Sequence, residues 1–314
     1  MRNLDQQLVW AFAGVLGLLA LSSLVGLILK AAIRKPEAQA TIRNLNARIG
    51  AWWIMSAIFG LTLVIGAIGS LVLFALMSLL ALREYVTLLP TRRADHRTLF
   101  WAFFIFTPLQ YVLIGIQWYG MFAILIPVYA FLFVPTRLAI AGDTESFLER
   151  ASAIQWGLMI CVYCLSYTPA LLMLRIPNYG RPAKLMLYLV LVDQLSDVLQ
   201  YVWGKLLGRH KIAPVVSPNK TWEGFVGGVL CATAIGTALW WMTPFTPLVA
   251  AAVSLTITLM GFAGGLTMSA IKRDRGVKDY GTLIKGHGGI LDRMDSMCFA
   301  APVFFHIVRY FYVP

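Results

Sequence analysis

Residues 8–29 read L-V-W-A-F-A-G-V-L-G-L-L-A-L-S-S-L-V-G-L-I-L, an apolar stretch without a single charged side chain. A helix needs about 20 apolar residues to cross the roughly 30 Å hydrocarbon core of a bilayer. The stretch is therefore predicted to span a membrane. Lys30, Arg34 and Lys35 follow it directly and no basic cluster precedes it, which predicts a retained anchor rather than a cleaved signal peptide.

Further stretches of this kind follow along the chain, which predicts an all-α, polytopic integral membrane protein with about ten transmembrane helices. The predicted spans are residues 8–29, 49–66, 67–89, 99–117, 119–140, 153–174, 184–206, 225–242, 247–268 and 297–312. Glycines near residue 66 separate the second and third spans by so little that a tight helical hairpin is expected there. No internal repeat or long linker divides the chain.

The composition supports the same interpretation. Of the 314 residues, 59% are hydrophobic and only 13% are charged, and the mean hydropathy is +0.75. Soluble domains carry about 25% charged residues, so a water-soluble single domain is excluded. The net charge of +12 must lie in the segments that stay in water, which predicts anionic partners such as lipid headgroups, phosphates or nucleotides. Nucleic acid is not favoured, because no basic soluble domain is long enough to read a groove.

Most of the basic residues lie in the loops that follow odd-numbered spans and in two polar segments near the C-terminus. Short loops rich in Lys and Arg stay in the cytoplasm. These segments are therefore predicted to face the cytoplasm, and both termini to face the opposite side. The loop 175–184 is basic on the side predicted to lie away from the cytoplasm.

Polar residues that could perform chemistry are concentrated in the segments 197–224 and 269–295. They are Asp197, Lys205, Arg209, Lys220, Lys272, Arg273, Lys278, Asp279, His287, Asp292, Arg293 and Asp295. Carboxylates bind hard divalent cations, which keep water ligands and bind substrate phosphates, while Arg and Lys neutralise phosphate oxygens. The combination predicts metal-assisted phosphate chemistry.

The spacing of the acidic residues sharpens this prediction. Asp292 and Asp295 stand three positions apart, so on a helix both carboxylates would point to one side. Gly288 and Gly289 precede them and allow a close backbone approach, with N–H groups suited to an anion. Asp197 lies within an apolar span, where a charge costs about 2.5–3.5 kcal/mol and is functional by default.

Two further acidic residues allow structural interpretations. Asp193, four residues before Asp197, is predicted to be buried against a basic partner, Lys205 or Arg209, rather than to bind a metal. Glu84, at the end of the third span, could pair with the adjacent Arg83 or reach the C-terminal segments. The sequence leaves both roles of Glu84 open.

The two polar segments resemble the phosphatidate cytidylyltransferase (CDP-diacylglycerol synthase) family of integral membrane enzymes. The second segment carries the family signature at Ser269, Lys272, Arg273, Lys278, Asp279, His287, Gly288, Gly289, Asp292, Arg293 and Asp295. The first segment is similar to the family pattern at Asp197, Tyr201, Gly204, Lys205, Ser217, Pro218, Lys220, Thr221 and Gly224. The spans before residue 184 resemble the family in hydropathy alone.

The resemblance implies a transferase of phospholipid biosynthesis that moves a cytidylyl group from CTP to phosphatidate, giving CDP-diacylglycerol and pyrophosphate. It implies Mg²⁺, with a possible second cation, and CTP and a lipid phosphate as substrates. It further suggests a homodimer in the bacterial inner membrane, with the site facing the cytoplasm. Residues 1–314 would form one membrane domain, with N-terminal helices in 1–183 and the catalytic part in 184–314.

The same resemblance implies roles for individual residues. Asp292, Asp295 and Asp197 are expected to bind the metal. The expected catalytic and phosphate-binding side chains are Lys220, Lys272, Arg273, Lys278, Arg293 and His287, together with Asp292 and Asp295. Further substrate contacts are expected from Ser217, Thr221, Ser269, Gly288 and Gly289.

Two positions depart from the family pattern. Lys285 stands where the family generally has Pro or Gly, which adds positive charge to the loop. Family members usually place a Gly-Asp pair four residues before the signature serine, and that aspartate helps to bind the metal; here the pair is Gly264-Gly265. Three outcomes stay open. Asp197 or Asp279 completes the site, the metal binds more weakly with activity retained at higher Mg²⁺, or the chain is a catalytically impaired paralogue.

Alternatives to the phosphatidate enzyme follow from the same observations. Gly265 is the sequence support for a paralogue that binds lipid phosphate or nucleotide without turnover. A cytidylyltransferase acting on another lipid phosphate is a variant of the first interpretation. An anion transporter would predict inverted repeats with broken helices in both halves, and the sequence contains neither.

Overall fold

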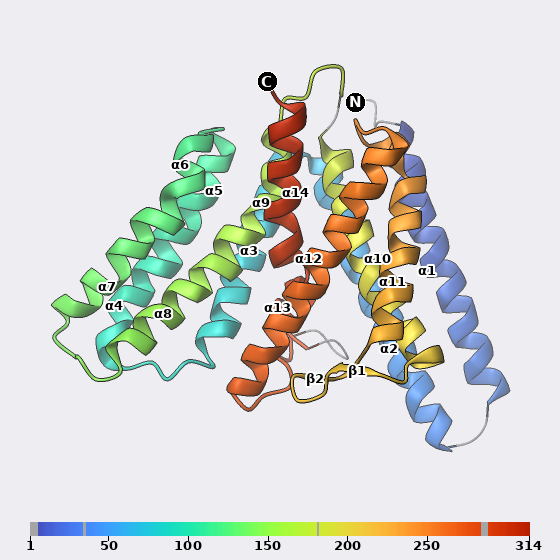
Figure 1. Cartoon of the computed structure of the whole chain (residues 1–314), viewed down its shortest axis with the longest axis horizontal. Coiled ribbons are helices and arrows are strands. Elements are labelled where there is room, and N and C mark those ends of the chain that lie inside the picture. The colour runs from blue at the N-terminus through green and yellow to red at the C-terminus, as the bar shows by residue number, and fades with distance from the viewer. Residues whose placement is uncertain (1–5, 34–35, 181, 284–287) are drawn as a thin grey trace.

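Most of the described chain is helical. The computed structural model describes residues 6–33, 36–180, 182–283 and 288–314, and helices form in every segment that was predicted to span the membrane. The prediction of an all-α, polytopic membrane protein is confirmed. The one β-sheet within these described ranges is a two-stranded antiparallel hairpin (Figure 1).

The N-terminal helices include three short π-helical stretches, η2 to η4, that continue the α-helices on either side. In chain order they are α1 (Gln6–Ala32), α2 (Pro36–Ile65), α3 (Ala67–Val86), η1 (Arg93–Asp95), α4 (His96–Trp101), η2 (Ala102–Phe106), α5 (Thr107–Gly115), α6 (Tyr119–Ile124), η3 (Leu125–Ala130), α7 (Phe131–Ile140), α8 (Phe147–Leu158), η4 (Met159–Cys164), α9 (Leu165–Ala170) and η5 (Leu171–Met173).

The C-terminal elements contain the hairpin and the two polar segments. In chain order they are α10 (Ala183–Leu207), β1 (Lys211–Ala213), β2 (Ser217–Thr221), α11 (Trp222–Ala238), η6 (Trp240–Met242), α12 (Pro247–Asp274), α13 (Leu291–Met294) and α14 (Met297–Tyr312).

Among the described residues, eight helices are long and apolar enough to cross a membrane. They are Gln6–Ala32, Leu45–Ile65, Ala67–Val86, Arg93–Gly115, Tyr119–Ile140, Phe147–Met173, Ala183–Leu207 and Pro247–Asp274. The other two predicted spans form the shorter helices α11, with 17 residues, and α14, with 16. Both pack along α12.

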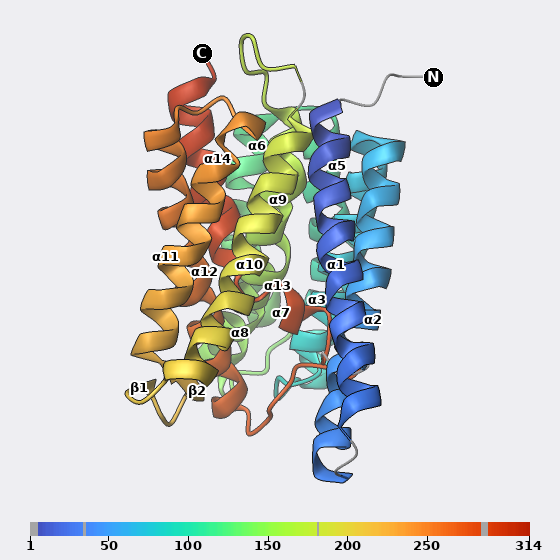
Figure 2. The same cartoon turned by 90° about the vertical axis from the view of Figure 1, so that its right-hand side faces the viewer.

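The helices run side by side, with α4 to α8 on one flank and α1 on the other (Figure 1). The start of α1 and the end of α14 lie at one end of the helices, and the hairpin lies at the opposite end, as both views show (Figure 2). The core between the helices is apolar and includes the fully buried side chains of Phe122, Tyr167, Tyr188 and Phe304. The polar segments therefore gather at the end away from both termini.

The crossing of α10 and α11 depends on glycines. A Cβ added at Gly224 would lie 2.9 Å from the Cα of Gly204, and one added at Gly228 would lie 2.6 Å from the backbone N of Gln200. Gly224 and Gly228 stand four residues apart, the pattern that lets membrane helices approach backbone to backbone. This approach holds the hairpin before α11 against the end of α10.

Helix α12 is longer than the predicted span, which ends at residue 268. It continues to Asp274 and ends in a Schellman motif, in which Val277 N–H donates to Lys272 O at 2.9 Å and Gly276 N–H donates to Arg273 O at 3.0 Å. Gly276 has a φ of +68°, which a residue with a Cβ rarely adopts. The residues of the second polar segment up to Asp274 thus stand on a rigid helix.

We predict that Gly228→Ala destabilises the protein by about 1–3 kcal/mol, because the added methyl group overlaps the α10 backbone. Gly14→Ala in α1 is the matched control: a Cβ there meets nothing within 4 Å, and alanine favours a helix over glycine by up to about 1 kcal/mol. Thermal unfolding of the detergent-solubilised variants measures both. Equal melting temperatures for the two variants would contradict a backbone-to-backbone crossing.

Candidate active site

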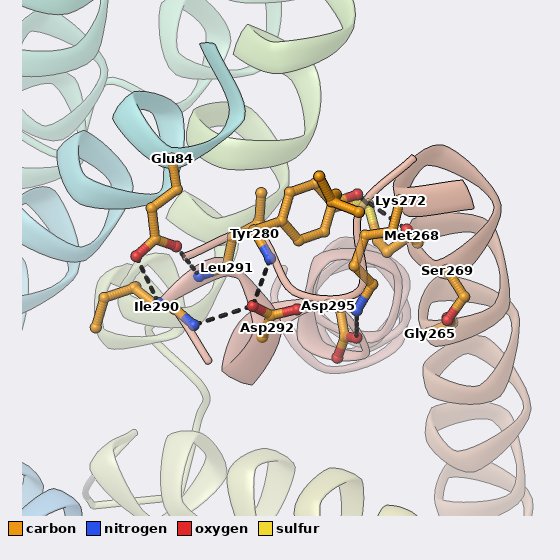
Figure 3. A network of polar contacts seen from close by, with 12 residues as sticks. Glu84, Gly265, Met268, Ser269, Lys272, Tyr280, Ile290, Leu291, Asp292 and Asp295 are labelled. Atoms are coloured by element: carbon orange, nitrogen blue, oxygen red, sulfur yellow. Dashed lines mark hydrogen bonds and ion pairs between the residues drawn. The ribbon is translucent and has the colours of Figure 1, made fainter. Parts of the chain in front are cut away.

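The site is built from four parts of the chain that meet at the hairpin end of the helices. Asp197 comes from α10, Lys220 from β2 and Lys272 from α12. Asp292 lies in α13, and Asp295 is the first residue after the end of α13. Figure 3 shows Lys272 reaching from α12 toward the two aspartates. Segments that are distant in sequence therefore supply both charge signs to one place.

Asp292 is the most extensively bonded carboxylate of the site. Its Oδ1 accepts from Lys272 Nζ at 2.8 Å, and its Oδ2 accepts from the backbone N–H groups of Tyr280 at 2.8 Å and Gly289 at 3.0 Å. The side chain is only 3% exposed. These bonds join the end of α12, the following loop and the start of α13 through one buried carboxylate.

Asp295 lies on the same side of the chain as Asp292. Its Oδ2 is 4.0 Å from Lys272 Nζ, so both carboxylates point toward one lysine, as their spacing predicts. Burial raises the pKa of the Asp295 carboxyl, and the positive charges of Lys272, Arg293 and Lys220 oppose this effect. At 18% exposure, Asp295 is the more accessible of the two aspartates.

The two glycines before α13 allow the backbone to approach and bond the Asp292 carboxylate. Gly288 has a φ of +80°, and a Cβ there would lie 2.6 Å from Asp292 Oδ2. The N–H of Gly289 donates to the same oxygen. The sequence predicted an anion near these glycines, and in the described structure that anion is the protein's own carboxylate. Binding of substrate by Gly288 and Gly289 stays a prediction.

Glu84 of α3 reaches this site from the N-terminal half. Its Oε1 accepts from Ile290 N–H at 3.0 Å and its Oε2 from Leu291 N–H at 2.9 Å (Figure 3). These backbone groups begin α13 and have no partner within a helix. A Cβ at Gly281 would lie 2.7 Å from Glu84 Oε1, so the loop packs directly on the carboxylate. Of the two roles that the sequence left open for Glu84, the structure shows the contact with the C-terminal segment.

Asp193 and Asp197 line the α10 side of the site. Asp193 is 1% exposed, and its Oδ2 accepts from Ser296 Oγ at 2.8 Å and Gln194 Nε2 at 3.1 Å. Asp193 is buried, as predicted, but its described partners are Ser296 and Gln194 and not a basic residue. Lys205, in the last turn of α10, and Arg209, beyond the end of that helix, are exposed. Asp193 Oδ1 is buried and accepts no hydrogen bond from the described part of the chain.

Two cations of the site have unused donors. The Nζ of Lys220 lies 4.5 Å from the centroid of the Phe262 ring, and no hydrogen bond or ion pair to it is found among the described residues. Burial lowers its pKa, and the charges of Asp197 and Asp295 oppose the shift. Arg293 Nε is buried, and none of the residues that the structure describes is its hydrogen-bond partner. A phosphate oxygen would satisfy both groups.

The hydroxyl groups of Thr221, Ser269 and Ser217, which were predicted to contact substrate, differ in the hydrogen bonds that they already make within the protein. Thr221 is the N-cap of α11, and its Oγ1 accepts from Gly224 N–H at 3.2 Å. Ser269 Oγ donates to Gly265 O at 2.6 Å, within α12. Ser217 is half-buried at the start of β2. Thr221 and Ser269 thus already make structural hydrogen bonds, and substrate binding by all three stays a prediction.

The remaining predicted residues lie toward the edge of the site. Arg273 donates to Val216 O at 3.3 Å and to Val277 O at 2.8 Å, so it fastens the hairpin turn to the loop after α12. Lys278 is exposed. His287 lies outside the described residues.

The residues of the site fit a magnesium ion only with water and substrate ligands. The described ranges contain no group of three or more His, Cys, Asp or Glu side chains placed to hold a metal. Mg²⁺ keeps several waters and uses one or two carboxylates together with substrate phosphates. Asp197 and Asp295, whose charges interact, supply carboxylate oxygens of that kind. Both acceptor sites of Asp292 Oδ2 are used, and Oδ1 accepts one bond, from Lys272, so a cation bound by Asp292 would sit on Oδ1 beside that ammonium.

The hairpin is held by Glu223 at the start of α11. Its Oε1 is 2.6 Å from His210 Nδ1, and its Oε2 accepts from the N–H groups of Arg209 at 3.0 Å and His210 at 3.2 Å. These backbone bonds, first that from Arg209, lower the pKa of Glu223 to about 2. Lys220 lies on this hairpin, so the hydrogen bonds of Glu223 help to position the lysine.

We predict that Glu84→Gln loosens the start of α13. A glutamine offers one acceptor and turns a donor toward the other N–H, and a hydrogen bond to a charged group is worth about 1.5–3 kcal/mol. Hydrogen exchange of the Ile290 and Leu291 amides measures the effect. Glu149→Gln, which alters an exposed carboxylate 3.6 Å from Arg275, is the control. Unchanged protection of both amides would contradict the bonds described here.

We predict a pH dependence of the hairpin from Glu223. Its pKa is depressed from 4.5 to about 2 in the folded protein, so its contribution to stability is complete above pH about 4.5 and is lost as the pH falls toward 2. The protection factors of the Arg209 and His210 amides, which correct for the intrinsic pH dependence of exchange, should therefore fall in that window. Glu223→Gln should remove the pH dependence, and a wild-type response identical to that of the variant would exclude this role.

Comparison with known proteins places the chain in a family. The model of the cytidylyltransferase family matches residues 46–311. The uncharacterized protein YnbB of Escherichia coli (strain K12) is 41% identical over 304 residues, which are 96% of this chain and 98% of that protein. The phosphatidate cytidylyltransferase of Staphylococcus aureus (strain COL) is 44% identical over 119 residues, 37% of this chain and 46% of that enzyme.

The enzyme of the same name from Staphylococcus saprophyticus subsp. saprophyticus is 38% identical over 145 residues, 46% of this chain and 56% of that enzyme. The chain thus matches about half the length of each of these two staphylococcal enzymes. The family match covers most of the chain, including all of the residues assembled at the hairpin end. This membrane protein belongs to the cytidylyltransferase family.

Proposed function

We propose that the protein is a phosphatidate cytidylyltransferase that converts CTP and phosphatidate to CDP-diacylglycerol and pyrophosphate. The observation that carries the proposal is the pair of cations with unused donors, Lys220 and Arg293, beside the carboxylates Asp197 and Asp295. Both side chains are half-buried, and a partly desolvated cationic donor without a hydrogen-bond partner is costly. Phosphate oxygens are natural acceptors for such donors. The similarity to enzymes named phosphatidate cytidylyltransferase supports the choice of nucleotide and lipid.

In the proposed reaction an oxygen of the lipid phosphate attacks the α-phosphorus of CTP in line. The bond from the α-phosphorus to the oxygen that bridges to the β-phosphorus breaks, and pyrophosphate leaves with that electron pair. The nucleophile is already an anion, so no general base is needed. The task of the protein is to bring two anions together and to neutralise their repulsion. Lys220 and Arg293 would bind their oxygens.

Lys272 has a different part in this proposal. Its ammonium is held by Asp292 at 2.8 Å and lies 4.0 Å from Asp295, so it keeps the two carboxylates on one side. A bound Mg²⁺ would neutralise charge on the phosphates, and Asp295 and Asp197 are the residues that would hold it together with water and substrate oxygens. Asp292 would position the loop that precedes α13.

The location of the reaction follows from the same proposal. The site lies at the end of the helices away from both termini (Figure 1), where the basic loops predict the cytoplasmic side of a bacterial inner membrane. CTP would approach from the water, and the lipid phosphate from the adjacent leaflet.

A direct assay tests the proposal. Purified protein with radiolabelled CTP, phosphatidate and Mg²⁺ should form labelled CDP-lipid with release of pyrophosphate. Product with another lipid phosphate but not with phosphatidate would assign the activity to that lipid. Binding of CTP without product, over a wide range of Mg²⁺, would identify a non-catalytic paralogue.

We predict that Asp295→Asn lowers the rate of CDP-lipid formation by at least about 100-fold, since the amide supplies no charge for a cation and no partner for the surrounding lysines. The matched control is Asp274→Asn at the end of α12, where the carboxylate is 69% exposed and pairs with Arg275. The control should retain wild-type turnover. Full activity of Asp295→Asn in folded protein would remove Asp295 from the site.

A further inference from the structure

The end of the helices opposite the candidate site carries basic side chains but no acidic ones among the residues that the structure describes. The segments there are 116–118, 174–180, 239–246 and 309–314 (Figure 1), and their sequences contain Arg175 and Arg309 but neither Asp nor Glu. This is the side predicted to lie away from the cytoplasm, where Lys and Arg are normally scarce. The two arginines therefore need a specific explanation.

Both arginines contact the turn between α5 and α6. Arg175 Nη2 donates to Gln117 Oε1 at 2.9 Å, and the guanidinium carbon of Arg309 lies 3.6 Å from the centroid of the Tyr119 ring. Trp118, between these two residues, is 57% exposed, as is typical of an aromatic side chain at the boundary between the hydrocarbon core and the headgroups. One turn thus places two guanidinium groups at the level of the lipid headgroups.

Neither arginine uses all of its hydrogen-bond donors within the described residues. A guanidinium group has five N–H donors. Arg175 uses one of them on Gln117. Arg309 packs on the face of the Tyr119 ring, which offers a π surface and no oxygen acceptor. The remaining donors suit an anion with several oxygens, such as a phosphate.

A shallow apolar groove lies on α14 beside Arg309. It has a volume of about 490 Å³ and is lined by Pro302, Val303, His306, Ile307, Tyr310 and Phe311. These residues recur at the spacing of one helix face, so the groove follows the helix from its end toward its start. Tyr310 and Phe311, at its outer end, are 80% and 70% exposed. An apolar groove that ends beside a cation fits a lipid chain joined to an anionic headgroup.

We propose that this end of the protein binds one anionic phospholipid of the adjacent leaflet. The headgroup phosphate contacts Arg175 and Arg309, and one acyl chain lies in the groove on α14. This surface is at the far end of the helices from the candidate active site (Figure 2). The proposal therefore does not depend on the proposed function.

A phospholipid fits this surface better than either a free anion or a second copy of the chain. A free phosphate has no apolar part to fill the groove. A second copy packed about a two-fold axis would bring the same surface against itself, so arginines would face arginines. The described segments at this end contain no carboxylate to pair with them. A phospholipid supplies the negative charge and the apolar chain together.

The first experiment measures which lipid the full-length protein retains, by native mass spectrometry of the detergent-purified protein with phosphatidylglycerol and phosphatidylcholine in competition. Wild type should retain one phosphatidylglycerol at least about tenfold more readily than phosphatidylcholine, and Arg309→Gln should lower this preference about fivefold, the usual contribution of one basic residue near anionic headgroups. Arg97→Gln removes an exposed arginine at the opposite end and should keep the wild-type preference. Equal preferences of wild type and Arg309→Gln, or equal losses in both variants, would overturn the proposal.

Arg309→Lys separates lipid binding from a role in folding. Lysine keeps the charge but loses the planar contact with Tyr119. If Arg309 only fastened α14 to α6, the lysine and glutamine variants would both lower the melting temperature and neither would change the ratio of bound lipids. Under the proposal, phosphatidylglycerol raises the melting temperature of wild type and Arg309→Lys more than that of Arg309→Gln. Equal shifts in all three proteins would contradict it.

The second experiment locates the bound chain. Full-length protein in nanodiscs receives a phosphatidylglycerol with a photoreactive diazirine in one acyl chain, and the crosslinked peptides are identified by mass spectrometry. Crosslinks should concentrate in residues 302–311, and Val303→Trp, which fills the groove, should remove most of them. Ile68→Trp, at a position of α3 that is 74% exposed, is the control and should leave them in place. Crosslinks spread evenly over the lipid-facing helices would refute the assignment of the chain to the groove.

Two further outcomes would assign the surface to another ligand. Displacement of the lipid by inorganic phosphate alone would identify a site for a free anion. A dimer that dissociates in Val303→Trp, with no change in bound lipid, would identify an interface between two copies of the chain. Either result would exclude the phospholipid site.

Discussion

The site depends on the hydrogen bonds that the buried carboxylate of Asp292 accepts. It accepts hydrogen bonds from Lys272 at the end of α12, from the backbone of Tyr280 in the following loop and from the backbone of Gly289 before α13. Removing one partner of such a buried ion pair typically costs about 3–5 kcal/mol, because the other charge is left uncompensated. Tyr280 and Gly289, on either side of residues 284–287, are therefore both held to this carboxylate.

Glu84 extends the same constraint to the N-terminal half of the protein. Its two oxygens accept from the first N–H groups of α13, so a helix more than 200 residues earlier in the sequence fixes the orientation of the segment that carries Asp292 and Asp295. The N-terminal helices thus do more than anchor the protein. They supply one of the supports of the loop on which the candidate site is built.

Some charged groups of the site have hydrogen-bond or ion-pair partners within the described protein, and others have atoms without one. Lys272 and Asp292 neutralise each other, and Arg273 is bonded to backbone carbonyls. With respect to the described residues, Lys220 and Arg293 keep unused donors and Asp193 keeps an unused acceptor oxygen. The bonded groups maintain the shape of the site, whereas the unbonded groups are the ones able to bind a substrate or an ion without first breaking a protein contact.

The sequence by itself determined the membrane-spanning class, the helical segments and the two polar segments, because apolar length and residue spacing are local properties of the chain. It also predicted that Asp292 and Asp295 share one side, which follows from helical periodicity alone. It could not determine the antiparallel hairpin of 211–221, the partner of Glu84, the hydrogen bonds of Asp193 or the contact of Arg309 with the Tyr119 ring. Only the tertiary structure decided these, because each one depends on how separate helices pack.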